Sequence, residues 1–225
     1  MNTQLTEIIF ILDRSGSMQR QLKAAISGFN NFLQEQKDTP GQGRLTLVLF
    51  NDAYKVSCQA LPLEEVPELD EMTFIPRGNT ALLDAMGRAI DELGVRLAAT
   101  PESDRPTQVI VATLTDGLEN TSIHFTLKEV AARIAHQRQV YNWEFFFLGA
   151  NQDAIGTAVS MNIRRNNSMA FAADEDGFDT SSKAISRKMR SVRKASSGYN
   201  LSPQEQEDLT GSLSQIGRDE EEKKK

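Results

Sequence analysis

The sequence predicts an α/β protein with three layers (α/β/α), in which helices cover both faces of a doubly wound, mostly parallel sheet that has one antiparallel edge strand. Two observations predict this fold. Short apolar runs such as residues 8–12 and 109–114 lack polar alternation, as strands buried on both faces do. Segments with apolar residues at helical spacing separate these runs, and that alternation is typical of parallel sheets.

The first half of the chain contains two strand-to-helix units and a hairpin. Its predicted elements are a strand at 8–12, a helix at 19–36, strands at 45–50 and 54–61, and a helix at 81–97. The first helix has apolar residues at steps of three and four, from Leu22 to Leu33. Asn51 and Asp52 form a tight turn, so the strands on either side of them should pair as the antiparallel edge.

The second half repeats the alternation. Its predicted elements are a strand at 109–114, a helix at 127–139, a strand at 144–148, a weaker helix near 153–161 and a short strand at 168–171. Residues 1–195 are expected to form one domain, which includes a basic helix at about 175–195. Residues 196–225 are expected to be a flexible polar tail, although 203–216 also fits a short helix.

The basic helix has two interpretations. Residues 183–194 contain six basic and no acidic side chains, while Ile185, Met189 and Val192 recur at helical spacing. A final helix that packs this apolar stripe on the domain is the simpler interpretation. The alternative is docking to an acidic partner or to nucleic acid, for which the segment lacks interleaved aromatic residues.

Composition restricts the class of protein. The 225 residues are 39% hydrophobic and 25% charged, with a formal net charge of -6, which does not favour a general nucleic-acid binder. Cys58 is the only cysteine, so no intrachain disulfide is possible. The first residues do not resemble a signal peptide, and no apolar run approaches the roughly 18 residues of a membrane span. These features predict a cytoplasmic protein that does not act at a membrane.

Oxygen-bearing side chains cluster after the apolar strands. Asp13, Ser15 and Ser17 follow the first strand, Thr80 opens a helix, and Asp116 follows the strand at 109–114. In open parallel sheets, ligands bind beyond the carboxyl ends of the strands, so these side chains should meet at one edge. Two carboxylates and three hydroxyls are hard donors, which favours Mg²⁺, with Mn²⁺ or Ca²⁺ also compatible, over Zn²⁺.

Each segment also has an ordinary structural interpretation. Asp and Ser before a helix are common caps, and Thr-Asp-Gly after a strand is common turn chemistry. A metal-dependent hydrolase or phosphatase that uses Asp13 and Asp116 is the main functional alternative. However, no second acid lies close to Asp13 in the sequence, and Ser15 lacks the Gly-x-Ser-x-Gly turn of a hydrolase nucleophile, even with His124 downstream. The sequence therefore predicts no catalytic residues.

The three segments together resemble the von Willebrand factor A domain. The motif consists of Asp13-x-Ser15-x-Ser17, Gly78-Asn79-Thr80 and Thr115-Asp116-Gly117, and the resemblance covers roughly residues 5–172. It implies a metal-ion-dependent adhesion site, in which Ser15, Ser17 and Thr80 are hydroxyl ligands while Asp13 and Asp116 act largely through coordinated water. It also implies that a partner protein's exposed Asp or Glu completes the magnesium shell. The single cysteine and the lack of a signal peptide are similar to the intracellular bacterial branch of the family.

Overall fold

The computed structural model describes residues 2–150 and 153–224. Met1, Asn151, Gln152 and Lys225, which fall within the predicted ranges 1–195 and 196–225, lie outside the described residues. The strands are β1 (Asn2–Asp13), β2 (Gln42–Phe50), β3 (Tyr54–Pro62), β4 (Pro106–Thr115), β5 (Glu144–Gly149) and β6 (Ser168–Ala170). The helices are α1 (Leu22–Lys37), α2 (Leu82–Ala99), α3 (Leu127–Tyr141), α4 (Ala154–Ser160), α5 (Glu175–Ser196), α6 (Pro203–Thr210) and α7 (Leu213–Glu222).

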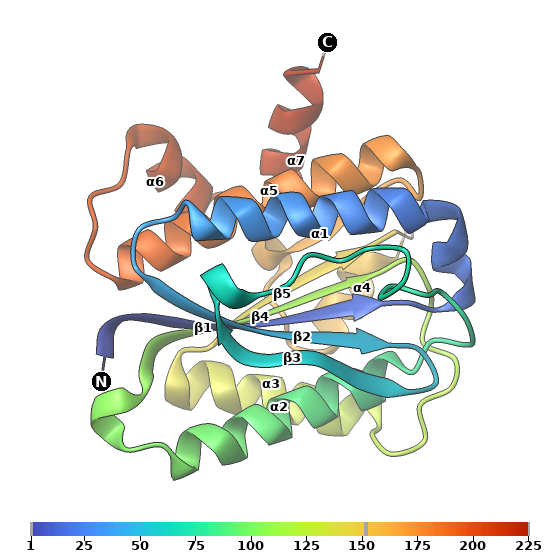
Figure 1. The fold of residues 1–225 in the computed structure, drawn as a ribbon, viewed down its shortest axis with the longest axis horizontal. Helices are drawn as coiled ribbons and strands as arrows, with labels where there is room; N and C mark the ends of the chain where they lie inside the picture. The colour runs from blue at the N-terminus through green and yellow to red at the C-terminus, as the bar shows by residue number, and fades with distance from the viewer. Residues whose placement is uncertain (1, 151–152, 225) are drawn as a thin grey trace.

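The described strands form a six-stranded sheet in the order β3-β2-β1-β4-β5-β6. Every neighbouring pair is parallel except β2 and β3, which are antiparallel. β1 therefore lies between β2 and β4, and the chain winds outward from it in both directions (Figure 1). The predicted fold class, including the antiparallel edge strand, is confirmed.

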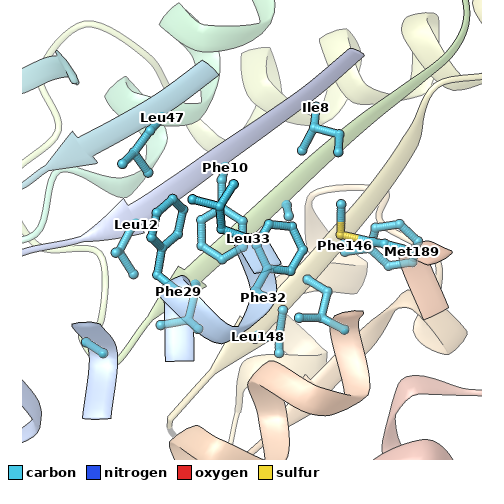
Figure 2. Packing of buried hydrophobic residues seen from close by; sticks show 14 of the residues in the cluster. Ile8, Phe10, Leu12, Phe29, Phe32, Leu33, Leu47, Phe146, Leu148 and Met189 are labelled. Carbon is cyan, nitrogen blue, oxygen red and sulfur yellow. The ribbon is translucent and has the colours of Figure 1, made fainter. Parts of the chain in front are cut away.

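Helices cover both faces of the sheet, with α1 and α5 on one side and α2 and α3 on the other (Figure 1). Successive residues of β1 point to opposite faces, so Ile8 packs beneath α1 and Ile9 beneath α2. On the α1 side, the ring of Phe10 lies 5.4 Å from that of Phe29 and 4.8 Å from that of Phe32, centroid to centroid (Figure 2). This alternation explains why the strands contain continuous apolar runs.

β1 begins at Asn2, six residues before the predicted strand. The sequence obscured this extension because it contains Thr6 and Glu7, both of which are buried. Glu7 Oε1 accepts a hydrogen bond of 2.5 Å from Arg96 of α2, an ion pair that compensates in part for burying the carboxylate. A tertiary contact thus permits a charged residue inside the sheet.

The basic helix lies where it was predicted, as α5, but it is not the final element. Ile185, Met189 and Val192 of α5 are buried in the core shared with α1. The predicted flexible tail contains two helices instead: α6 packs on α5, and α7 packs on both α5 and β6 (Figure 1). Leu213 and Ile216 of α7 are buried. The tail is polar overall, yet these two apolar residues join the core that includes α5, and its acidic side chains form ion pairs with basic residues of α5.

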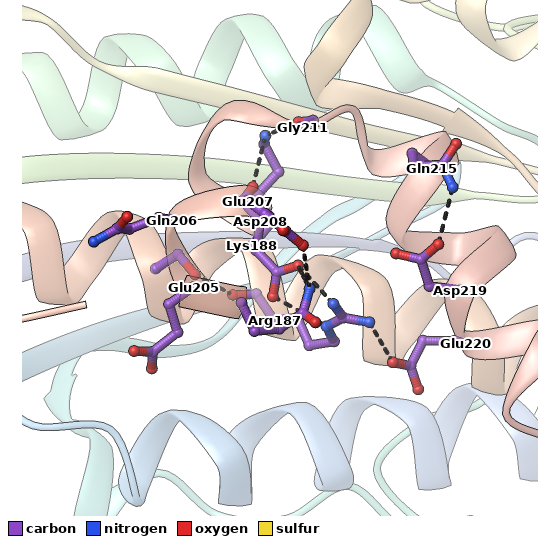
Figure 3. A network of polar contacts seen from close by, with 12 residues as sticks. Arg187, Lys188, Glu205, Gln206, Glu207, Asp208, Gly211, Gln215, Asp219 and Glu220 are labelled. Atoms are coloured by element: carbon purple, nitrogen blue, oxygen red, sulfur yellow. Dashed lines mark hydrogen bonds and ion pairs between the residues drawn. The ribbon is translucent and has the colours of Figure 1, made fainter. Parts of the chain in front are cut away.

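Arg187 of α5 joins α6 and α7. Its guanidinium donates hydrogen bonds of 2.6 Å to Asp208 of α6 and 2.6 Å to Glu220 of α7 (Figure 3). Lys188 donates to the carbonyl oxygens of Asp208, Leu209 and Gly211, which end α6. Arg187 and Lys188 of α5 therefore bind acceptors within the same chain, on α6 and α7. Across residues 2–150 and 153–224, no helix has the length and apolar character needed to cross a membrane.

Candidate metal site at the carboxyl edge of the sheet

Three loops meet at the carboxyl ends of β1 and β4. The loop after β1 contacts the loop before α2 through two backbone hydrogen bonds: Gly16 N–H to Gly78 O at 2.9 Å, and Arg77 N–H to Arg14 O at 2.9 Å. Gly78 has a φ of +74°, and a β-carbon there would lie 1.9 Å from Asp52 Oδ2, so only glycine fits this turn. The backbone thus fixes the predicted segments beside one another.

Asp13 ends β1 and is fully buried. One carboxylate oxygen accepts the backbone N–H of Ser15 at 2.7 Å, and the other accepts the hydroxyl of Thr115 at 2.5 Å. Burial raises the pKa of Asp13 to about 6, although both hydrogen bonds act in the opposite direction. A cation at this edge would favour the ionised form of Asp13.

The two serines connect the first loop to Asp116. Ser15 Oγ lies 3.1 Å from Ser17 Oγ, and the Ser17 hydroxyl donates to Asp116 Oδ1 at 2.6 Å. Asp116 is half-buried, and burial raises its pKa more than the hydrogen bond from Ser17 lowers it. These contacts form a chain of three oxygen-bearing side chains across 99 residues of sequence.

Thr80 completes the group. It is buried, and its backbone N–H donates to Asn120 Oδ1 at 3.0 Å. A β-carbon on Gly117 would lie 2.5 Å from Thr80 Oγ1, so the threonine hydroxyl lies directly against the residue that follows Asp116. The structure therefore brings all five predicted side chains, Asp13, Ser15, Ser17, Thr80 and Asp116, to one edge of the sheet.

Helix capping does not account for these hydroxyls. Ser15 occupies the N-cap position of the short 3₁₀ helix Gly16–Gln21, but its side chain caps no backbone N–H there. The N-cap residue of α2 is Ala81, and Thr80 does not cap that helix either. By contrast, Thr126 caps α3 with a complete capping box. The hydroxyls of Ser15 and Thr80 are therefore available for another role.

Two supporting residues were given no role in the sequence analysis, although Thr115 belongs to the motif named there. Thr115 fixes the Asp13 carboxylate, and Asn120 fixes the backbone of Thr80 through hydrogen bonds in both directions. Thr115 is the last residue of an apolar strand, and a polar residue at that position, next to Asp116, could have indicated that its hydroxyl supports the site. Asn120 gave no comparable signal, because its role depends on how the loop after β4 folds over α2.

The donor set is poor in carboxylates. Within residues 2–150 and 153–224, no group of three or more His, Cys, Asp or Glu side chains is placed to hold a metal ion. Of the five predicted side chains, two are carboxylates, Asp13 and Asp116, and the other three are hydroxyls. Such a set suits a hard cation and does not suit zinc.

Two pockets lie near the ends of the sheet. One of about 450 Å³ adjoins the candidate site and is lined by residues that include Asn51, Ala81 and Arg88. A second, of about 610 Å³, lies at the opposite edge, where Pro106 begins β4, and none of the predicted site residues lines it. The first pocket includes Ala81, the residue after Thr80, but none of the five predicted site residues lines it either.

Comparison with solved structures identifies the fold. A von Willebrand factor type A protein from Catenulispora acidiphila aligns with 87% of this chain at a TM-score of 0.53 and 16% identity. The manganese-loaded TRAP protein of Plasmodium vivax aligns with 76% of it at 0.55 and 16% identity. The ArnB paralog VWA2 of Sulfolobus acidocaldarius aligns with 84% at 0.52 and 15% identity. The chain has the von Willebrand factor A fold.

Sequence comparison assigns the chain to no family. No protein-family model matches the sequence, and no curated protein matches it. The chain spans 43% of the Catenulispora protein and 45% of the Sulfolobus protein, but 70% of the Plasmodium protein. The resemblance in three dimensions therefore concerns the von Willebrand factor A fold itself, which the sequence motif predicted.

Proposed function

We propose that this von Willebrand factor A fold is a divalent-cation-dependent protein-interaction module. Ser15, Ser17 and Thr80 would bind Mg²⁺ through their hydroxyls, and Asp13 and Asp116 would act largely through coordinated water. When bound, the ion would supply an electrophilic position that accepts a carboxylate from another protein. The partner would therefore present an exposed Asp or Glu.

The convergence of Ser15, Ser17 and Asp116 supports this proposal most strongly. The two serine hydroxyls and the Asp116 carboxylate lie in hydrogen-bond contact, although neither serine caps a helix. Uncharged hydroxyl donors leave a bound cation more positive than carboxylate donors would, and that favours an external acid as a further ligand. The manganese-loaded state of the Plasmodium structure is consistent with a divalent ion in this fold.

Exposed apolar side chains in the same loops favour a protein as the ligand. Leu118 and Ile123, in the loop after β4, are 63% and 84% exposed, and Met72 and Ile75, in the loop before α2, are 83% and 50% exposed. Large apolar side chains concentrated near a polar site are typical of interaction surfaces. They would pack against residues that flank the partner's acidic side chain.

Calorimetric titration with MgCl₂ tests the ion site. We expect Asp116→Asn, which keeps an acceptor for Ser17 but removes the charge, to weaken magnesium binding by at least tenfold. Asp38→Asn is the matched control, since it removes an exposed carboxylate that follows α1 and accepts from Gln34, away from the three loops of the site. Equal losses in the two variants would show a general effect of charge, and unchanged binding in Asp116→Asn would contradict the assignment.

A further inference from the structure

Arg14, between Asp13 and Ser15, is an unusual buried cation. It is 6% exposed, and its Nε is buried without a hydrogen-bond partner. Its guanidinium makes no hydrogen bond or ion pair with any residue in 2–150 or 153–224. Burying Nε without a partner costs free energy, whereas the two Nη atoms are not among the buried unpartnered atoms and remain open to an external anion.

The other buried cations of the chain are paired. Arg187 contacts Asp208 and Glu220, and Arg193 donates to the carbonyl oxygens of Gln36 and Gly41. Lys188 has three carbonyl acceptors. Nε of Arg193 is also buried without a partner, but its Nη atoms donate, whereas the described residues accept no hydrogen bond from any nitrogen of the Arg14 guanidinium, which lies beside the candidate metal site.

The charged neighbour that acts on Arg14 is another cation. The backbone N–H of Arg77 donates to Arg14 O at 2.9 Å, and the exposed Arg77 side chain adds positive charge to the same place. Burial, and then the charge of Arg77, lower the pKa of Arg14. Arg14 and Arg77 thus lie on two backbone segments that are hydrogen-bonded to each other, and the described residues supply no anion to either side chain.

These two segments adjoin the proposed ion site. Arg14 lies between two residues of the Asp13-x-Ser15 motif, and Arg77 immediately precedes Gly78-Asn79-Thr80. An acidic side chain that reached the ion would place neighbouring residues of its own chain near both arginines. Guanidinium groups bind carboxylates through two parallel hydrogen bonds, which makes them selective for a carboxylate of the right position.

We propose that the partner segment presents two acidic side chains a few residues apart, the first for the metal ion and the second for Arg14 and Arg77. This inference rests on the proposed function and specifies the partner: an acidic pair rather than a single acid. The unpaired positive charge of the two arginines is what selects for the second carboxylate.

A displayed random-peptide library, selected on the full chain in MgCl₂, tests the proposal. We expect selected peptides to contain two acidic residues at a preferred spacing. Their affinity for Arg77→Gln should fall on the order of tenfold, while matched peptides with the second acid replaced by its amide should bind the parent and Arg77→Gln equally. Arg20→Gln, which removes an exposed cation from the same loop, is the control and should bind like the parent.

The outcomes separate the two proposals. Magnesium-dependent selection of peptides with one acid, bound equally by parent and Arg77→Gln, would overturn the acidic pair and leave the ion site standing. Acidic peptides that bind equally in EDTA, or no acidic selection, would overturn both. Arg14→Gln gives a second measurement where thermal melting shows that it folds, and a loss of the preference for two acids is the expected result.

Discussion

At the scale of single residues, two threonine hydroxyls of β4 have sharply different surroundings, and one of them supports the candidate metal site. Thr115 donates to the buried Asp13 carboxylate at 2.5 Å. Thr113, two residues earlier in β4, is also fully buried, but no described residue forms a hydrogen bond with its hydroxyl. The same side chain therefore stabilises the protein at one position and costs free energy at the other.

Thr115→Val and Thr113→Val form a matched pair of substitutions with opposite predictions. Thr115→Val leaves a buried carboxylate oxygen without its donor, so we expect a loss of about 1–3 kcal/mol in the free energy of unfolding, and weaker magnesium binding. Thr113→Val removes an unsatisfied hydroxyl and should be neutral or stabilising by up to about 1 kcal/mol. Urea denaturation measures both, and equal losses would contradict the hydrogen-bond assignment.

At the scale of elements, α6 and α7 are held to α5 by charge as well as by apolar burial. Arg187 lies between Asp208 and Glu220, and the side chains of all three are about nine-tenths buried. Lys194 pairs with Glu205 at 2.7 Å and adds a second connection between α5 and α6. The acidic residues of the chain's end thus complement the basic residues of α5.

Removal of Arg187 should release both helices. Arg187→Met leaves the buried Asp208 carboxylate without its cation and Glu220 with Lys223 alone, so we expect the free energy of unfolding to fall by about 3–5 kcal/mol. Lys183→Met on the same helix breaks a partly exposed pair with Asp179, which also keeps Lys224, and should cost at most about 1 kcal/mol. Chemical denaturation gives both values, and limited proteolysis should cut Arg187→Met first within residues 197–222.

The elements also show what sequence reasoning can reach. Apolar periodicity located the strands and helices of the sheet, since Ile8 to Leu12 and Val109 to Leu114 are buried as their composition requires. It missed the start of β1, where Glu7 depends on Arg96, and α7, where only Leu213 and Ile216 carry the apolar signal. Such contacts join residues far apart in sequence and leave no local pattern.

At the scale of the whole molecule, acid should loosen the chain from its C-terminal end. Hydrogen bonds from Lys194 and from the Ser202 backbone hold the pKa of Glu205 below its ordinary value. Burial raises the pKa of Glu220, but Lys223 and Arg187 outweigh it and the pKa is lowered. Both carboxylates contribute stability that is complete above their unfolded pKa of about 4.3 and is lost as the pH falls through their folded pKa.

Glu205→Gln measures this contribution. We expect the variant to be less stable than the parent at pH 7, and the difference to shrink toward zero as the pH falls below about 4, since the parent then loses the same charge. Thermal melting from pH 7 to pH 3 provides the two curves. Glu207→Gln, an exposed position on the same helix, is the control and should follow the parent throughout. Parallel curves for Glu205→Gln would contradict the role of the Lys194 pair.

The central position of β1 has a consequence for synthesis of the chain. β1 is made before both of its neighbours, β4 begins only at Pro106, and Asp116 is made 99 residues after Ser17. At about 5–20 residues per second, that interval lasts roughly 5–20 s. During this time one edge of β1 lacks its partner strand, and Asp13 lacks both Thr115 and Asp116. The proposed ion site can therefore form only after β4 has been made, and β5 and β6 follow it along the chain.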